Sequence, residues 1–150
     1  MKTVKNFAGI VCVVLLGVCL WACLKPVPVD VVMIGNEVFF VLEEEQEISA
    51  VRVAVFNPGK ADSPGETMWA IGHDLTTEVK KRKYPRLRQI QYGQILDEFP
   101  GVTGPAGLKR NVEYWVAIDL GDKFAREVFI MTDDNKIVMP RRKDKGENAR

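Results

Sequence analysis

The chain has 150 residues, a length typical of one domain, and 47% of them are hydrophobic. Beyond residue 24 it carries enough valine, isoleucine, leucine, phenylalanine and tryptophan to bury a core, which excludes general disorder. The formal net charge is +1, from 21 basic and 20 acidic residues, and removing residues 1–22 with Lys2 and Lys5 leaves 19 against 20, or −1. A near-neutral body gives no electrostatic basis for binding nucleic acid.

The cysteines and the histidine limit the chemistry of the chain. Cys12, Cys19 and Cys23 all lie within the first 23 residues, so the body beyond them can form neither an internal disulfide nor a cysteine metal site. His73 is the single histidine and cannot by itself make a histidine-rich site. We therefore expect no metal and no cofactor in the body.

The amino terminus has the pattern of an export signal. Lys2 and Lys5 precede residues 7–24, which run for eighteen positions without a charge, and Lys25 and Pro26 end the run. The lysines favour the cytoplasmic side, so the rest of the chain is expected outside the cytoplasm. The run fits a cleaved signal, a lipoprotein signal or an uncleaved single-pass anchor helix, although eighteen residues is short for a span of about 20.

The end of this run, Leu20-Trp21-Ala22-Cys23, resembles the lipobox of bacterial lipoproteins, with Trp21 standing where a small residue is usual. The resemblance implies that residues 1–22 are a signal peptide. It also implies that Cys23 receives diacylglycerol and an N-acyl chain, and two or more chains anchor a protein firmly. Leu24 follows in place of the aspartate that retains lipoproteins in the inner membrane, so in a Gram-negative cell we expect the outer membrane, facing the periplasm. Residues 23–28 would be the lipidated terminus and a short tether.

The body reads as short strands separated by turns. Gly35-Asn36 and Gly121-Asp122 are turn signals, and residues 75–83 form a short helix at most. The pattern predicts an all-β, antiparallel sandwich of about seven strands over residues 29–140, followed by a disordered basic tail over residues 141–150. The expected strands cover residues 29–34, 37–42, 48–56, 67–72, 86–92, 111–119, 124–132 and 136–139.

One local motif refines this prediction. The stretch from Leu108 to Tyr114, followed by alternating Val116 and Ile118, resembles the entry to the penultimate strand of fibronectin type III domains. The resemblance implies an immunoglobulin-like sandwich in which Tyr114 is the corner tyrosine, its hydroxyl bonded to the preceding loop. Arg110-Asn111 stands where that family commonly has Pro-Gly.

A run of positive charge over residues 80–86 is the main candidate for a binding surface. It could meet anionic lipid headgroups or an acidic partner, or be an ordinary solvated loop. Arg88 extends the run, and Tyr84 and Tyr92 flank it as possible interface anchors. Phe99, in the loop over residues 97–107, is a further candidate because apolar loop residues at the end of a sandwich often bind partners. The candidate partner-binding residues are Lys80, Lys81, Arg82, Lys83, Tyr84, Arg86 and Phe99.

The remaining polar clusters do not indicate catalysis or metal binding. The acidic residues 43–45 and Glu47 are expected in a solvated loop or partner surface, because consecutive side chains diverge and do not converge on calcium. His73 and Asp74 are neighbours that point to opposite faces of a strand, and Ser63 lacks a nucleophile motif. We therefore expect a protein that is not an enzyme.

These observations favour a membrane-anchored envelope lipoprotein whose non-catalytic sandwich binds another macromolecule. The expected partners are the bilayer and a protein of unknown identity, with no nucleic acid. The general layout also resembles periplasmic immunity lipoproteins that neutralise type VI secretion toxins. The same sequence is compatible with a structural factor for envelope assembly or maintenance, and with a single-pass protein that keeps an uncleaved helix.

Overall fold

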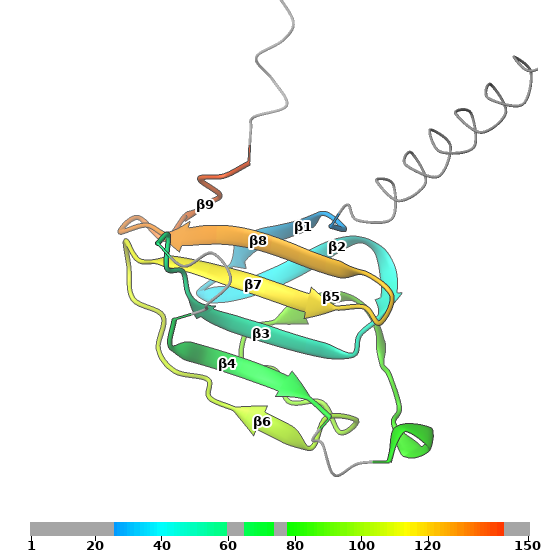
Figure 1. Cartoon of the computed structure of the whole chain (residues 1–150). Helices are drawn as coiled ribbons and strands as arrows, with labels where there is room; N and C mark the ends of the chain where they lie inside the picture. Colours follow the sequence, from blue (N-terminus) through cyan, green and yellow to red (C-terminus); the bar gives the residue numbers. More distant parts are fainter. Residues whose placement is uncertain (1–25, 60–64, 74–77, 143–150) are drawn as a thin grey trace, which may run out of the picture.

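The computed structural model describes residues 26–59, 65–73 and 78–142. In these ranges the chain is all-β, with nine strands in two antiparallel sheets (Figure 1). The expected signal peptide, Cys23 and the anchor helix lie outside the described residues. Within the described ranges no helix has the length and apolar character needed to cross a membrane.

The two sheets differ in size. The three-stranded sheet has the order β1 (Val29–Ile34), β2 (Glu37–Glu47) and β5 (Arg86–Gln91). The six-stranded sheet has the order β6 (Gly101–Thr103), β4 (Thr67–Gly72), β3 (Ala50–Val55), β7 (Glu113–Asp119), β8 (Phe124–Met131) and β9 (Ile137–Val138). A 3₁₀ turn, η1 (Val79–Lys81), precedes β5.

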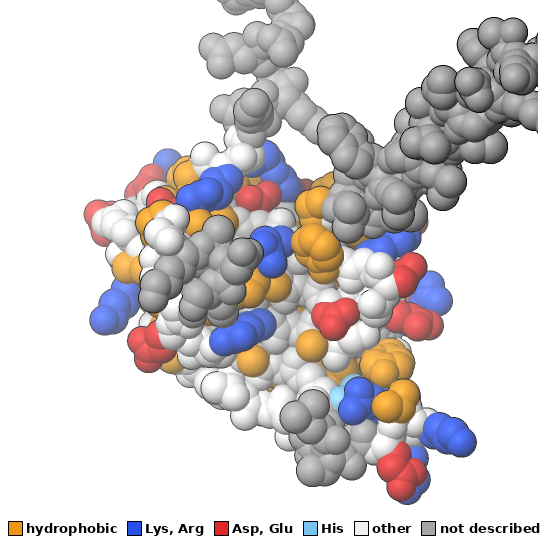
Figure 2. All heavy atoms as spheres, in the orientation of Figure 1, with side chains coloured by type: hydrophobic (Ala, Val, Ile, Leu, Met, Phe, Trp, Pro, Cys, Tyr) orange, Lys and Arg blue, Asp and Glu red, His pale blue; other side chains and the backbone are white. Residues whose placement is uncertain are grey.

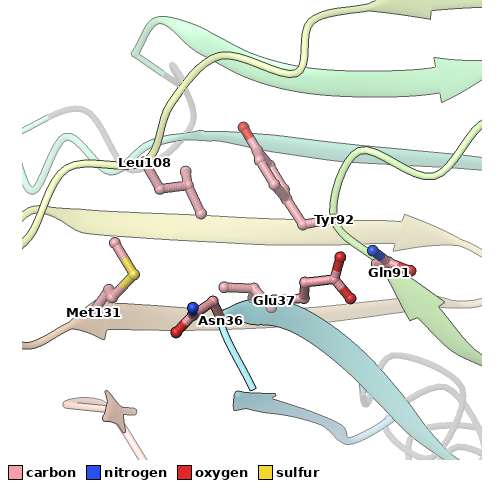
Figure 3. A pocket seen from close by; sticks show the side chains of 7 residues that line it. Asn36, Glu37, Gln91, Tyr92, Leu108 and Met131 are labelled. Atoms are coloured by element: carbon pink, nitrogen blue, oxygen red, sulfur yellow. The ribbon is translucent and has the colours of Figure 1, made fainter. Parts of the chain in front are cut away.

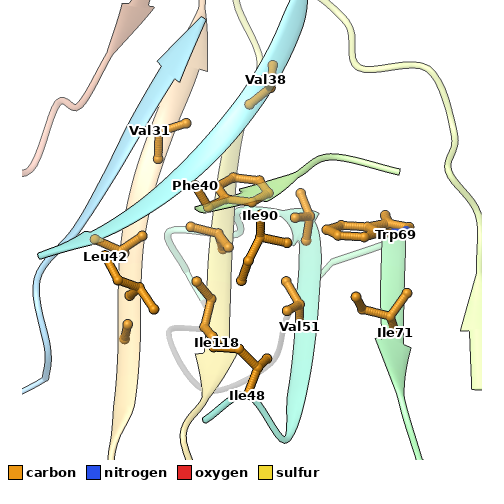
Figure 4. Close-up of a cluster of buried hydrophobic side chains, with 14 of the residues drawn as sticks. Val31, Val38, Phe40, Leu42, Ile48, Val51, Trp69, Ile71, Ile90 and Ile118 are labelled. Carbon is orange, nitrogen blue, oxygen red and sulfur yellow. The ribbon is translucent and has the colours of Figure 1, made fainter. Parts of the chain in front are cut away.

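The core lies between the sheets and follows the period-2 alternation of the strands. In β7 the side chains of Tyr114, Val116 and Ile118 are buried, and the residues between them are more exposed. The three-stranded sheet contributes side chains such as Phe40 and Ile90 to the same cluster (Figure 4). Burying each large apolar side chain stabilises the fold by about 1.5–3 kcal/mol, so this cluster is the main source of stability.

The predicted hydrogen bond between the Tyr114 hydroxyl and the preceding loop is confirmed. Its ring is 1% exposed, and its hydroxyl accepts a hydrogen bond from the backbone N–H of Lys109 at 2.8 Å. Asn111 in the same turn has φ of +58°, a left-handed conformation that asparagine tolerates better than most residues. The side-chain amide of Asn111 also donates to the Asp133 carboxylate at 2.9 Å, which helps to hold this turn.

Three expectations about the elements need correction. The acidic residues 43–45 and Glu47 lie within β2 and not in a loop, because Glu47 pairs with Arg86 on β5 after a register shift. The short strand β6 was not expected, and it raises the strand number to nine in the described ranges. The ordered domain also extends past residue 140, because Arg141 stacks 4.2 Å from the Phe56 ring centre; residues 143–150 lie outside the description.

Arg142 joins the two sheets. Its guanidinium contacts the carboxylate of Asp30 on β1, donates to the carbonyl of Val29 at 2.9 Å, and lies 3.2 Å from a carboxylate oxygen of Glu127 on β8. Hydrogen bonding to Asp30 is the main cause of the raised pKa of Arg142. The residue therefore fastens the first strand of one sheet to the other sheet.

Candidate functional site

The basic segment, defined as residues 80–86, lies at the end of the sandwich where β1 and β5 begin. Lys80, Lys81 and Lys83 are exposed, and Arg82 is half-buried. Lys81 lies 3.2 Å from Glu78, and Arg86 lies 3.5 Å from Glu45 and 3.9 Å from Glu47. The acidic end of β2 therefore offsets part of the positive charge of this segment.

The expectation for Phe99 is wrong, because its side chain belongs to the core. It is 1% exposed and packs edge-to-face against His73, with 5.3 Å between the ring centres. Tyr84 meets the same histidine ring at 5.4 Å, and its side chain remains 38% exposed. Of these two predicted aromatic contacts, only Tyr84 is available to a partner.

His73 has a structural contact that the sequence did not reveal. Its Nε2 lies 2.8 Å from the carbonyl oxygen of Lys83, so Nε2 carries the proton and donates it. This bond and the ring of Tyr84 attach the basic segment to the end of β4. Asp74, the neighbour considered as a catalytic partner, lies outside the described residues.

Tyr92, considered above as an interface anchor, has a hydroxyl that is bonded to a loop. Its hydroxyl donates to the carbonyl oxygen of Ala106 at 2.7 Å, and burial is the main cause that raises its pKa to about 12. Tyr92 also lines a cavity of about 250 Å³ together with Glu37, Leu108 and Met131 (Figure 3). A phenol with so high a pKa cannot serve as a general base near neutral pH.

A second surface, which the sequence did not indicate, covers the outer side of the six-stranded sheet. We call it the arginine–alanine face and define it as Ala50, Arg52, Ala70, Trp115, Ala117, Phe124 and Arg126. The register aligns Ala70, Arg52, Ala117 and Arg126 in one row across β4, β3, β7 and β8. The solvent side of an antiparallel sheet is usually polar, but here small and aromatic side chains separate the two arginines. Figure 2 views the molecule from this side.

Both arginines of this face are held in position without a carboxylate partner among the described residues. Arg52 donates from Nε and Nη2 to the hydroxyl of Thr67 at 3.1 and 2.7 Å. Arg126 stacks over the rings of Trp115 and Phe124, at 5.3 and 5.6 Å from their centres. Neither arginine forms an ion pair with a residue that the structure describes, so their charges remain available to a ligand.

Both arginines line a shallow depression of about 250 Å³. Ala50 and Ala117 line it together with Phe124 and Asp119. One oxygen of the Asp119 carboxylate already accepts the backbone N–H of Gly121 at 2.8 Å. Two strand spacings separate the backbones of Arg52 and Arg126, about 10 Å, so the depression can accept protruding side chains between two fixed cations.

A larger groove of about 770 Å³ borders this face where the chain enters the domain. Pro26, Val27 and Pro28 line it together with Arg126 and the Arg142 ion pairs. Val27 is fixed there, because its backbone N–H donates to Phe124 at 2.8 Å. Across the described ranges, histidine, cysteine and acidic side chains form no group of three that could hold a metal ion.

Comparison with known proteins gives no family assignment. The chain matches no protein-family model, no curated protein and no solved structure. The functional interpretation therefore depends on the sequence and on the geometry of these surfaces.

Proposed function

We propose that this chain is a cell-envelope lipoprotein, anchored through Cys23, whose sandwich binds another protein through the arginine–alanine face. The observation that supports this proposal most strongly is the composition of that face. Arginine and tryptophan are enriched in protein interfaces, and the face presents Arg52, Arg126 and Trp115. Lysine and alanine are both depleted there, so the two arginines and the tryptophan support the proposal and the alanine floor does not. The basic segment has the opposite composition, with three exposed lysines and an arginine engaged by glutamates.

An immunoglobulin-like topology supports a binding role. Strands β3, β7 and β8 are adjacent in one sheet, as strands C, F and G are in immunoglobulin domains, and β2 lies in the opposite sheet. The corner tyrosine, Tyr114, occupies the strand that corresponds to F. Such sandwiches serve many functions, so the fold supports the proposal only together with the composition of the face.

The position of Val27 supports close attachment to a membrane. Val27 is bonded to β8, and four peptide units separate it from Cys23, a span of at most about 14 Å. Acyl chains on Cys23 would therefore hold the sandwich near the bilayer surface. A partner confined to the same envelope compartment would meet the face at a high local concentration.

Photocrosslinking in intact cells tests this function. The photoreactive residue p-benzoylphenylalanine replaces Ala117 at the centre of the face, and the matched control replaces Gln89, an exposed residue of β5 in the other sheet. We expect a discrete protein adduct from position 117 and none from position 89. The same adducts from both positions, or none from position 117, would count against binding through this face.

A further inference from the structure

The charges of the arginine–alanine face indicate the chemistry of its partner. We propose that the face binds an acidic polypeptide segment, with one carboxylate at Arg52, another at Arg126, and small or apolar side chains in the depression between them. This inference rests on the proposed function, because it names the partner class for the same surface.

Arg52 and Arg126 are both held in positions from which they can bind carboxylates. The Thr67 hydroxyl receives two of the five guanidinium donors of Arg52, so the remaining N–H groups stay available for an incoming acid. The ring centres of Trp115 and Phe124 lie 5.3 and 5.6 Å from the guanidinium carbon of Arg126, and no hydrogen bond or ion pair with a described residue occupies its N–H groups. Because both side chains are already positioned, less conformational entropy is lost when a carboxylate binds.

The shape of the face favours a polypeptide over a lipid surface. A bilayer is flat on this scale and cannot enter a depression floored by Ala50 and Ala117. Residues i, i+2 and i+4 of an extended segment share one face, so carboxylates at i and i+4 can reach the arginines while the side chain at i+2 enters the depression. The Asp119 carboxylate at the rim would repel a continuous sheet of anions more than it would repel two separate carboxylates.

Binding of a defined peptide to the full chain in a neutral detergent tests the inference. The probe is a synthetic peptide of about twelve residues that repeats Glu-Ser-Ala-Ser, so that glutamate and alanine alternate along one face, and a Gln-Ser-Ala-Ser repeat is its uncharged match. We expect NMR shift changes at the Trp115 indole and at Ala117 with the acidic peptide only. The Arg52→Gln/Arg126→Gln variant should weaken binding roughly tenfold, about 1.4 kcal/mol.

The control is Lys80→Gln/Lys83→Gln, which removes the same charge from the basic segment and should leave peptide affinity within about twofold, because screening is strong beyond about 10 Å. Equal binding of both peptides, or equal loss in both variants, would overturn the inference. Phosphatidylglycerol vesicles that bind through Arg52 and Arg126 while the peptide does not would overturn it in favour of lipid. A crosslinked protein at position 117 without peptide binding would overturn the acidic partner and leave the proposed function standing.

Discussion

Tyr114 offers a direct test of how the motif around it stabilises the fold. Tyr114→Phe removes only the hydroxyl oxygen that accepts the N–H of Lys109 at 2.8 Å. The ring remains, so its packing against Phe129, with 5.7 Å between centres, should persist. The substitution therefore isolates one hydrogen bond from the packing around it.

The size of the loss follows from what happens to the freed N–H group. A protein hydrogen bond contributes about 0.5–1.5 kcal/mol net, and a buried donor without a hydrogen-bond partner costs about 1–3 kcal/mol. Lys109 is exposed, so water can reach part of its backbone even though the Tyr114 side chain is buried. We expect Tyr114→Phe to lower the free energy of unfolding by about 1–1.5 kcal/mol.

Urea unfolding of the full chain in neutral detergent, followed by tryptophan fluorescence, measures this loss. Tyr84→Phe is the control, because the Tyr84 side chain is 38% exposed and its hydroxyl has no hydrogen bond with the described residues; its effect should stay within about 0.5 kcal/mol. If both variants unfold at the same urea concentration, the hydroxyl bond of Tyr114 does not hold the turn. A loss above roughly 3 kcal/mol would mean that the core repacks and that the reasoning from one bond is wrong.

Three further predictions concern other parts of the structure. Phe99→Ala should destabilise by about 3–5 kcal/mol in urea unfolding and Phe124→Ala by less than about 1, and similar losses would contradict the burial of Phe99. The pKa of Tyr92 is raised from 10.0 to about 12, so its stabilising effect is complete below pH 10 and is lost as pH rises through 12. Thermal melts over this window should fall less steeply for Tyr92→Phe, and parallel curves would exclude this linkage. Arg142→Gln should cost about 1–3 kcal/mol of unfolding free energy, because Glu127 loses its cation, and an unchanged urea midpoint would show that the sheets do not need this contact.

The strands that carry the core were predictable from the sequence because their side chains alternate. Val51 and Val53, and then Val116 and Ile118, repeat at every second position, and all four are buried. The motif around Tyr114 predicted the turn before β7, since that turn depends on residues that lie close together in the sequence. Features set by neighbouring residues along the chain were therefore accessible without a structure.

Features that depend on contacts between residues far apart in the sequence could not be predicted from the sequence. The glutamate run reads as a loop, yet it extends β2 because Glu47 faces Arg86 across a strand pair. Phe99 lies in a segment with loop composition, and only its contact with His73 shows that it is buried. Arg142 reads as part of a charged tail until Asp30 is placed beside it.

The arginine–alanine face left a signal that is clear only in retrospect. Outward positions of β3 and β7 carry Ala50 and Ala117 where a solvated sheet would carry polar residues. Alternation alone does not show which strands are adjacent, so the alignment of Arg52 with Arg126 needed the strand order. The basic segment was easier to notice because its charges are consecutive.

Membrane attachment through Cys23 is tested most directly by the intact mass of the native protein extracted from washed membranes. We expect a chain that begins at Cys23 and carries diacylglycerol and an amide-linked acyl chain, and we expect Cys23→Ala to lose these lipids while Cys19→Ala keeps them. A native chain that retains residues 1–22, carries no lipid and fractionates with the cytosol would contradict the proposed location and role.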